Sequence, residues 1–144
     1  MEITTNKLDE TKEFAARVVS GLKPKEGGAT ILALYGDLGS GKTSFTQGLA
    51  AAFGLCETIA SPTFVIEKIY ELEHQIFKRL IHIDAYRLDG GEDLVKLGFE
   101  DIAADPDNLI VIEWPERVKD ILPATASALT FTFIDDNTRT IKYD

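Results

Sequence analysis

A glycine-rich segment directly after an apolar run is the feature of this sequence that most restricts its fold. Residues 36–43 fit the pattern G-x-x-x-x-G-K-[ST] in full, and residues 31–35 are typical of a buried strand. The segment reads Gly36-Asp37-Leu38-Gly39-Ser40-Gly41-Lys42-Thr43. Glycines let the backbone curl close to a polyphosphate, so that successive N–H groups point at its oxygens. The pattern therefore predicts a phosphate-binding loop between a strand and a helix, with a chance glycine-rich turn as the alternative.

The residue types after the second glycine predict a nucleoside triphosphate with magnesium as the ligand. Lys42 would reach the outer phosphates as a point charge, and the Thr43 hydroxyl would bind Mg²⁺. The helix that begins here, with Ser44 in its first turn, would present its positive end to the phosphates. We therefore expect a nucleoside triphosphate and Mg²⁺ at residues 36–44.

Length and composition indicate one globular domain over residues 1–144. The chain has 144 residues, of which 44% are hydrophobic and 27% charged, as in ordinary globular proteins. No apolar run approaches the roughly 20 residues that cross a bilayer, and the first residues do not resemble a signal peptide. We therefore expect a cytoplasmic protein that does not contact a membrane.

The net charge and the few cysteines and histidines argue against direct nucleic-acid binding, a disulfide and a structural zinc site. The formal net charge of -9 would repel a nucleic-acid backbone, so any role with RNA is expected to pass through a protein partner. The single cysteine, Cys56, excludes an internal disulfide, and with only two histidines the chain lacks the ligands of a structural zinc site.

Hydrophobic periodicity predicts an α/β fold. Apolar spacing near 3.6 and glycine or proline stops predict helices at 8–22, from the loop to about 53, and at 92–96. Strands are expected at 31–35, 64–70, 79–83, 109–112, 129–134 and 140–143. The second and third strands form a hairpin, 109–112 is interior, and the last pair makes an antiparallel edge. The expected architecture is a three-layer P-loop NTPase fold with a central mixed, largely parallel sheet.

Two of the apolar strands end in an acid, Asp84 and Glu113. In an open α/β sheet, ligands bind outside the carboxyl ends of the parallel strands, so either acid could face the phosphates. One such group can hold Mg²⁺ and another can orient the attacking water. An acid at a strand end can also be a turn former or a helix cap.

Three further features each allow a structural and a functional interpretation. The segment Ser61-Pro62-Thr63-Phe64 could be a switch that orders on the γ-phosphate, or a simple Ser-Pro turn. His82 alternates onto one strand face with Asp84, but two ligands make a poor metal site, and a satisfied, half-buried histidine is the commoner case. Trp114 could cover the site or pack in the core.

Several motifs occur in the order found in the bacterial TsaE (formerly YjeE) family, which the chain resembles over nearly its whole length. They are the phosphate-binding loop at 36–43, S-P-T-F at 61–64, H-I-D-A-Y-R-L at 82–88 and I-E-W at 112–114. The loop is shared by many families, whereas the combination is specific. The resemblance implies a small ATPase that acts with TsaB and TsaD to place threonylcarbamoyl on the adenosine beside the tRNA anticodon. TsaD would carry the group transfer, and ATP turnover would reset the complex.

The resemblance also assigns roles to single residues. It implies that Lys42 binds the phosphates, that Thr43 and Glu113 hold Mg²⁺, and that Asp84 orients water or joins the metal shell. Thr11 matches a family threonine near the base side of the nucleotide, although exposure on a helix explains it equally well. Ser61 to Phe64 becomes the first switch, and Trp114 matches a tryptophan beside the site. Low intrinsic hydrolysis would fit, since only the chain's own five arginines are available unless a partner lends one.

Three other functions share some of these features. Asn6-Lys7-Leu8-Asp9 spells the guanine-reading N-K-x-D, but that motif needs a buried strand before it, and only residues 1–5 precede it here. A small-molecule kinase would use the same loop, usually with an arginine-rich lid that this sequence lacks. A nucleotide-gated binding module would need ATP to order a docking segment but would not need hydrolysis.

Overall fold

The computed structural model describes residues 2–37, 40–55 and 66–143, and within them the chain forms a seven-stranded mixed sheet in the order β1-β7-β6-β2-β5-β4-β3. The strands are β1 (Glu2–Thr5), β2 (Thr30–Tyr35), β3 (Glu67–Glu71), β4 (Arg79–Asp84), β5 (Asn108–Glu113), β6 (Ser127–Phe133) and β7 (Arg139–Tyr143). The inner strands β6, β2, β5 and β4 run parallel. Antiparallel strands close both sides, β3 beside β4 and β7 with β1 beside β6.

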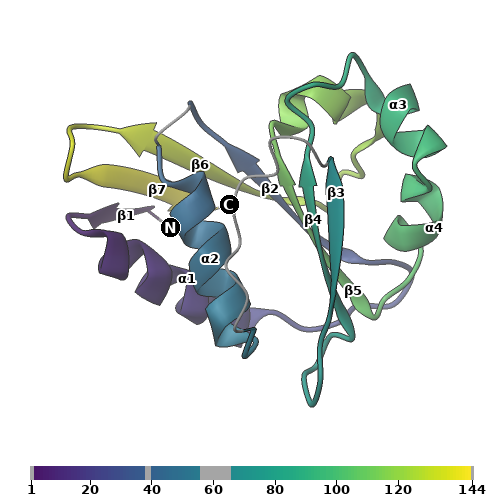
Figure 1. The fold of residues 1–144 in the computed structure, drawn as a ribbon, viewed down its shortest axis with the longest axis horizontal. Helices are drawn as coiled ribbons and strands as arrows, with labels where there is room; N and C mark the ends of the chain where they lie inside the picture. Colours follow the sequence, from purple (N-terminus) through teal and green to yellow (C-terminus); the bar gives the residue numbers. More distant parts are fainter. Residues whose placement is uncertain (1, 38–39, 56–65, 144) are drawn as a thin grey trace.

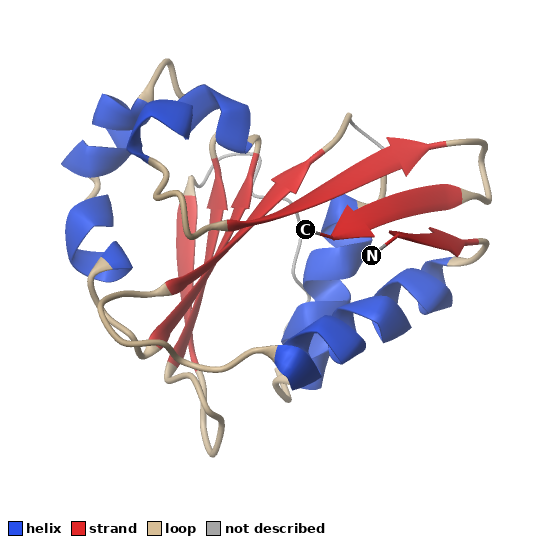
Figure 2. Cartoon of the chain, turned by 180° about the vertical axis from the view of Figure 1, so that it is seen from behind, coloured by secondary structure: helices blue, strands red, loops and turns tan. Residues whose placement is uncertain are grey.

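Helices cover both faces of this sheet, which gives the expected three layers (Figures 1 and 2). They are α1 (Leu8–Gly21), α2 (Lys42–Ala52), α3 (Gly91–Lys96), α4 (Phe99–Ala103) and the 3₁₀ helix η1 (Pro115–Ile121). Side chains alternate across each strand, so Leu32 and Leu34 pack under α1 and α2, whereas Ile31 packs with α3, α4 and η1. Each face therefore has its own apolar core.

Close packing of α1 on α2 fixes the helix that follows the glycine-rich loop. A Cβ on Gly48 of α2 would lie 2.6 Å from the Cα of Lys12, so only glycine allows this approach. Phe45 of α2 also packs against Phe131 of β6, with ring centroids 5.5 Å apart. The start of α2 is thus held against both α1 and the sheet.

The predicted elements agree with the structure at their centres, and the differences lie in short segments. The expected α/β architecture is confirmed, with β5 in the interior beside β2, the middle strand of the sheet order. The hairpin is confirmed as β3 and β4, although β3 begins at Glu67 and residues 64 and 65 lie outside the described residues. Helices α4 and η1 and strand β1, of four to seven residues each, were not predicted, and none of them contains a continuous apolar run of the kind that marked the predicted strands.

Strand β1 bears on the guanine-reading alternative. A strand does precede Asn6, which the sequence did not indicate, but β1 pairs only at the sheet edge with β7 and alternates between exposed and covered residues. Guanine readers need a buried strand before that motif. The N-K-x-D sequence at 6–9 therefore does not follow a buried strand, as a guanine-binding motif would.

None of the helices in the described ranges combines the length and the apolar composition that a bilayer span requires.

Candidate functional site

The glycine-rich loop leaves β2 and enters α2 through backbone conformations that favour glycine. Gly36 and Gly41 have φ of 145° and 108°, and the Gly41 carbonyl accepts the first helical hydrogen bond, from Phe45 N at 3.0 Å. A Cβ on Gly36 would lie 2.6 Å from the carbonyl oxygen of Phe131 and 2.7 Å from Ser40 Oγ. Glycine is therefore required at 36 by the approach of β6 as well as by φ. Leu38 and Gly39 lie outside the described residues.

Lys42, the first residue of α2, carries a buried ammonium. The residue is 5% exposed, and its Nζ donates a hydrogen bond to the Gly36 carbonyl at 2.6 Å and lies 4.0 Å from the centroid of the Trp114 ring. Burial lowers the pKa of Lys42, and nearby carboxylates oppose that shift, namely Glu113, Glu116, Asp84 and Asp37. The loop thus holds a desolvated cation that a stronger acceptor than a carbonyl would stabilise.

The two predicted acids lie side by side at the carboxyl ends of β4 and β5. Asp84 and Glu113 are opposite each other in the parallel register, and Glu113 is also opposite Leu34 near the end of β2. Glu113 is 3% exposed, whereas Asp84 is half-buried. Asp84 Oδ1 accepts a hydrogen bond from Tyr86 N at 3.0 Å, which confirms its interpretation as a turn former.

His82 has a partner that sequence spacing did not reveal. Its Nε2 lies 2.5 Å from Glu113 Oε2, and both side chains are almost wholly buried. The expectation of a satisfied histidine is confirmed, but the residue is fully buried rather than half-buried. The contact joins residues 31 apart in sequence, and only the pairing of β4 with β5 brings them together.

Trp114 both covers the lysine and packs in the core, so its two interpretations are compatible. The residue has φ of 57° directly after β5, and its ring lies against Tyr86 with centroids 5.1 Å apart. It also contacts the apolar core under α3 and η1. The Arg117 guanidinium lies 5.6 Å from the Tyr86 ring, so stacked groups lead from Lys42 to the surface.

Thr11 is buried, which makes exposure on a helix the wrong explanation for a threonine there. It is 2% exposed, and its Oγ1 lies 3.0 Å from Thr5 Oγ1 of the edge strand β1. The hydroxyl therefore links α1 to β1 in this structure.

The remaining residues of the predicted nucleotide site lie around the start of α2. Asp37 is exposed, and Thr43 and Ser44 are half-buried in the first turn of α2. Ser40 Oγ is buried and has no hydrogen-bond partner among the described residues. The predicted switch at 61–64 lies outside the described residues, as does Cys56.

Arg139 is a neighbour of the loop that the sequence analysis did not identify. A Cβ on Gly41 would lie 3.8 Å from Arg139 Cγ. The guanidinium donates hydrogen bonds to the carbonyls of Asp135 and Thr138 and lies 4.6 Å from the Phe133 ring. The β6–β7 hairpin thus places the aliphatic part of an arginine side chain beside the loop, and no local pattern could have indicated this.

These donors fit a magnesium nucleotide. The positive φ values of Gly36 and Gly41, the buried Lys42 ammonium and the Ser40 hydroxyl, which has no partner among the residues that the structure describes, suit an anionic ligand. Carboxylate and hydroxyl oxygens are the ligands that Mg²⁺ prefers, usually together with phosphate oxygens. The described residues contain no group of three or more His, Cys, Asp or Glu side chains that could hold a metal ion.

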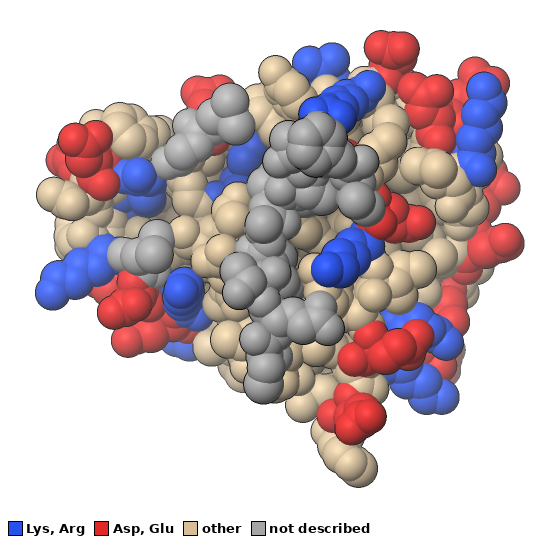
Figure 3. Space-filling view, in the orientation of Figure 1, with Lys and Arg blue, Asp and Glu red and all other residues tan. Residues whose placement is uncertain are grey.

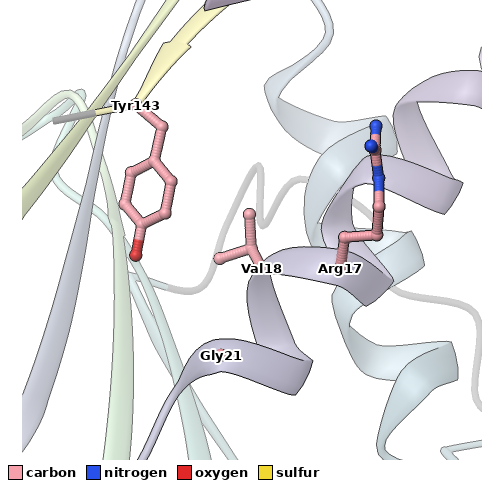
Figure 4. Close-up of a pocket in the computed structure, with 4 residues that line it drawn as sticks. All are labelled: Arg17, Val18, Gly21 and Tyr143. Carbon is pink, nitrogen blue, oxygen red and sulfur yellow. The ribbon is translucent and has the colours of Figure 1, made fainter. Parts of the chain in front are cut away.

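A separate hollow of about 340 Å³ lies between α1 and β7 (Figure 4). Its lining comprises Arg17, Val18, Gly21 and Tyr143, none of them a predicted site residue. Tyr143 lies at the opposite end of β7 from Arg139, so the hollow is distinct from the glycine-rich loop.

A strand, a glycine-rich loop and a lysine-headed helix, with acids ending the neighbouring parallel strands, define a P-loop NTPase fold. The family model described as "Threonylcarbamoyl adenosine biosynthesis protein TsaE" matches residues 5–141, and the chain belongs to this family. The family's role lies in the biosynthesis of tRNA threonylcarbamoyladenosine, so the chain has a part in that modification machinery.

Individual relatives agree with this assignment. The chain is 37% identical over 137 residues to the tRNA threonylcarbamoyladenosine biosynthesis protein TsaE of Rickettsia typhi, covering 94% of this chain and 89% of the relative. It is 39% identical over 105 residues to the protein of the same name from Borreliella burgdorferi, covering 72% and 74%. The crystal structure of Bacillus subtilis YdiB superposes with a TM-score of 0.76 at 28% identity, covering 99% of this chain and 83% of that one.

Proposed function

We propose that this chain binds and hydrolyses ATP with Mg²⁺, and that it acts with TsaB and TsaD in the threonylcarbamoyl modification of tRNA. The observation that carries the proposal is the buried Lys42 ammonium at the head of α2, beside the paired acids Asp84 and Glu113. A P-loop lysine binds the outer phosphates of a triphosphate, and neighbouring acids serve the metal and the attacking water.

The positions of the loop and strand-end residues support their proposed roles, whereas the role of Thr11 rests on the family resemblance. Lys42 would exchange its hydrogen bond to the Gly36 carbonyl for one to phosphate oxygens, which are stronger acceptors for an ammonium. Thr43 and Glu113 would hold Mg²⁺, which neutralises phosphate charge when it is bound. Asp84 would orient the attacking water, since its half-buried carboxylate lies beside Glu113 in the register. Thr11 would belong to the base side of the site.

Surface charge supports contact with tRNA only through partners. Figure 3 shows Lys and Arg side chains interleaved with Asp and Glu side chains, and the described residues in view form no continuous basic patch on this face. The net charge of -9 opposes direct binding to a phosphate backbone. TsaB and TsaD would therefore make the contacts to tRNA.

ATP turnover with and without the TsaB–TsaD pair tests the proposal, for the parent chain and for Lys42→Ala. We expect slow phosphate release by the parent alone, faster release with the partners, and none by Lys42→Ala. Phosphate release without any acceptor would also argue against a small-molecule kinase. Absence of heat when Mg-ATP is titrated into folded parent protein would refute the proposal at its first step.

A nucleotide-gated binding module is the second candidate, and the stacked groups around Trp114 favour it. They connect Lys42 to Tyr86, which is 48% exposed, so occupancy of the loop could change a docking surface. An Asp84→Ala variant that binds ATP without cleaving it separates the two functions. Full support of the partners by this variant would favour gating, whereas loss of the modification would favour hydrolysis.

A further inference from the structure

His82 is the residue that contacts the carboxylate of Glu113. The Nε2–Oε2 distance is 2.5 Å, and the two side chains are 1% and 4% exposed. Both belong to the sheet face under α2, because His82 and Glu113 continue the strand alternation of Leu80 and Val111. With Glu113 ionised, Nε2 must carry the hydrogen and donate it.

We propose that His82 is a positioning residue that holds Glu113 in the orientation in which it binds Mg²⁺. This inference rests on the proposed function, in which Glu113 is a metal ligand. The imidazole engages one carboxylate oxygen from within the sheet, so the glutamate side chain cannot turn freely at the strand end. Partners that hydrogen-bond to metal ligands orient them, and their loss typically weakens metal binding about 10–100-fold.

Position in the fold distinguishes His82 from the other polar groups near the site. His82 projects from the middle of β4, opposite Val111, whereas Asp84 and Glu113 lie together at the strand ends. It therefore supports the carboxylate from behind, away from the end of the sheet where the loop lies. A histidine that only filled space would be replaceable by an apolar side chain of similar size without effect on metal binding.

The first experiment measures how strongly Mg²⁺ improves the affinity for a non-hydrolysable ATP analogue, by calorimetry in EDTA and across a magnesium titration. His82→Leu keeps bulk but removes the donor, and we expect it to raise the Mg²⁺ concentration for half-maximal effect about 10–100-fold. Its affinity in EDTA should match that of the parent. His82→Gln supplies an amide N–H near the position of Nε2 and should restore the parent's magnesium dependence to within several-fold.

The chain supplies its own control. His74, the only other histidine, is exposed on the β3–β4 connection, so His74→Gln should leave every value unchanged. Glu113→Gln should raise the Mg²⁺ concentration for half-maximal effect at least as much as His82→Leu does, and adding His82→Leu to Glu113→Gln should raise it little further. Circular dichroism and thermal melting show which variants are folded.

A second measurement needs no substitution. In protein with ¹⁵N-labelled histidine, the Nε2 resonance of His82 should shift when Mg²⁺ is added to the nucleotide complex, while that of His74 should not. If His82→Leu folds and keeps the parent's magnesium dependence, or if the His82 resonance is indifferent to Mg²⁺, His82 only packs and the proposal is wrong. If the parent itself shows no magnesium dependence, the proposed function fails first and this inference falls with it.

Discussion

The two ends of strands β4 and β5 carry polar clusters of opposite character. At the amino ends, Arg79 donates hydrogen bonds to Asn108 Oδ1 at 2.9 Å and to Asp105 Oδ2 at 3.2 Å, and Asn108 Nδ2 donates to the Ile102 carbonyl at 2.9 Å. At the carboxyl ends, the Lys42 ammonium is buried against a carbonyl and an aromatic ring. Ser40 Oγ beside it has no partner among the described residues.

The difference separates a structural cluster from a binding site. Buried polar groups that satisfy one another stabilise a fold and leave nothing for a ligand. Groups held in strained backbone, or buried without a strong partner, reduce stability and gain most when a ligand arrives. The amino ends should therefore govern stability, and the carboxyl ends nucleotide binding.

The largest effect should follow Gly36→Ala, which tests whether the loop depends on its backbone conformation. The new Cβ would meet a carbonyl of β6 at 2.6 Å, and φ is 145°. We expect the free energy of unfolding to fall by about 2 kcal/mol or more and ATP binding to be lost. Gly54→Ala is the matched control, since Gly54 also has positive φ (78°) but no atom of the described residues lies within 4 Å of where its Cβ would be. Equal losses in the two variants would show that strain alone, and not the approach of β6, matters at Gly36.

Asn108→Ala should have the next largest effect, and on stability alone. Asn108 is 2% exposed, and its removal takes from the Ile102 carbonyl its side-chain donor and from Arg79 one of its acceptors. We expect a loss of about 2 kcal/mol in urea unfolding, with unchanged affinity for Mg-ATP in the residual folded protein. A selective loss of nucleotide affinity would contradict the division between the two ends.

The same division explains what could be predicted from the sequence. The loop at 36–43 and the acids Asp84 and Glu113 were predicted because each lies in a local pattern, a glycine spacing or an apolar run that ends in a carboxylate. The contact of His82 with Glu113 depends on the register of two strands, and the burial of Thr11 on an edge strand of four residues. Long-range contacts of this kind leave no periodic signal in the chain.

A smaller effect is expected for Arg139→Gln, which tests whether the binding end extends to the β6–β7 hairpin. Its side chain passes close to Gly41, but the guanidinium is partly exposed and bonded to its own hairpin. A partly solvated charge near an anion contributes on the order of 1 kcal/mol, so we expect about fivefold weaker ATP binding at low salt. Arg17→Gln, on the exposed side of α1, should leave affinity unchanged. If Arg139→Gln and Arg17→Gln bind ATP with the same affinity, the binding site does not extend to the β6–β7 hairpin.

The smallest effect concerns the stability of Lys42→Met, which should not be lower than that of the parent at neutral pH. Methionine keeps an apolar stem against Trp114 and removes a buried cation.

The pH dependence of this difference follows from the lysine's pKa. Burial lowers the native pKa of Lys42 below the ordinary 10.5, so between these two pKa values the unfolded chain binds more protons than the folded one. The stability of the parent relative to Lys42→Met should therefore rise as pH increases through this window toward 10.5. Urea unfolding of both proteins at several pH values measures this change. The opposite result would be a parent that is more stable than the variant at neutral pH, with a difference in unfolding free energy that narrows as pH rises. The ammonium would then stabilise the folded chain. In that case the carboxyl ends of the strands, like the amino ends, would serve stability.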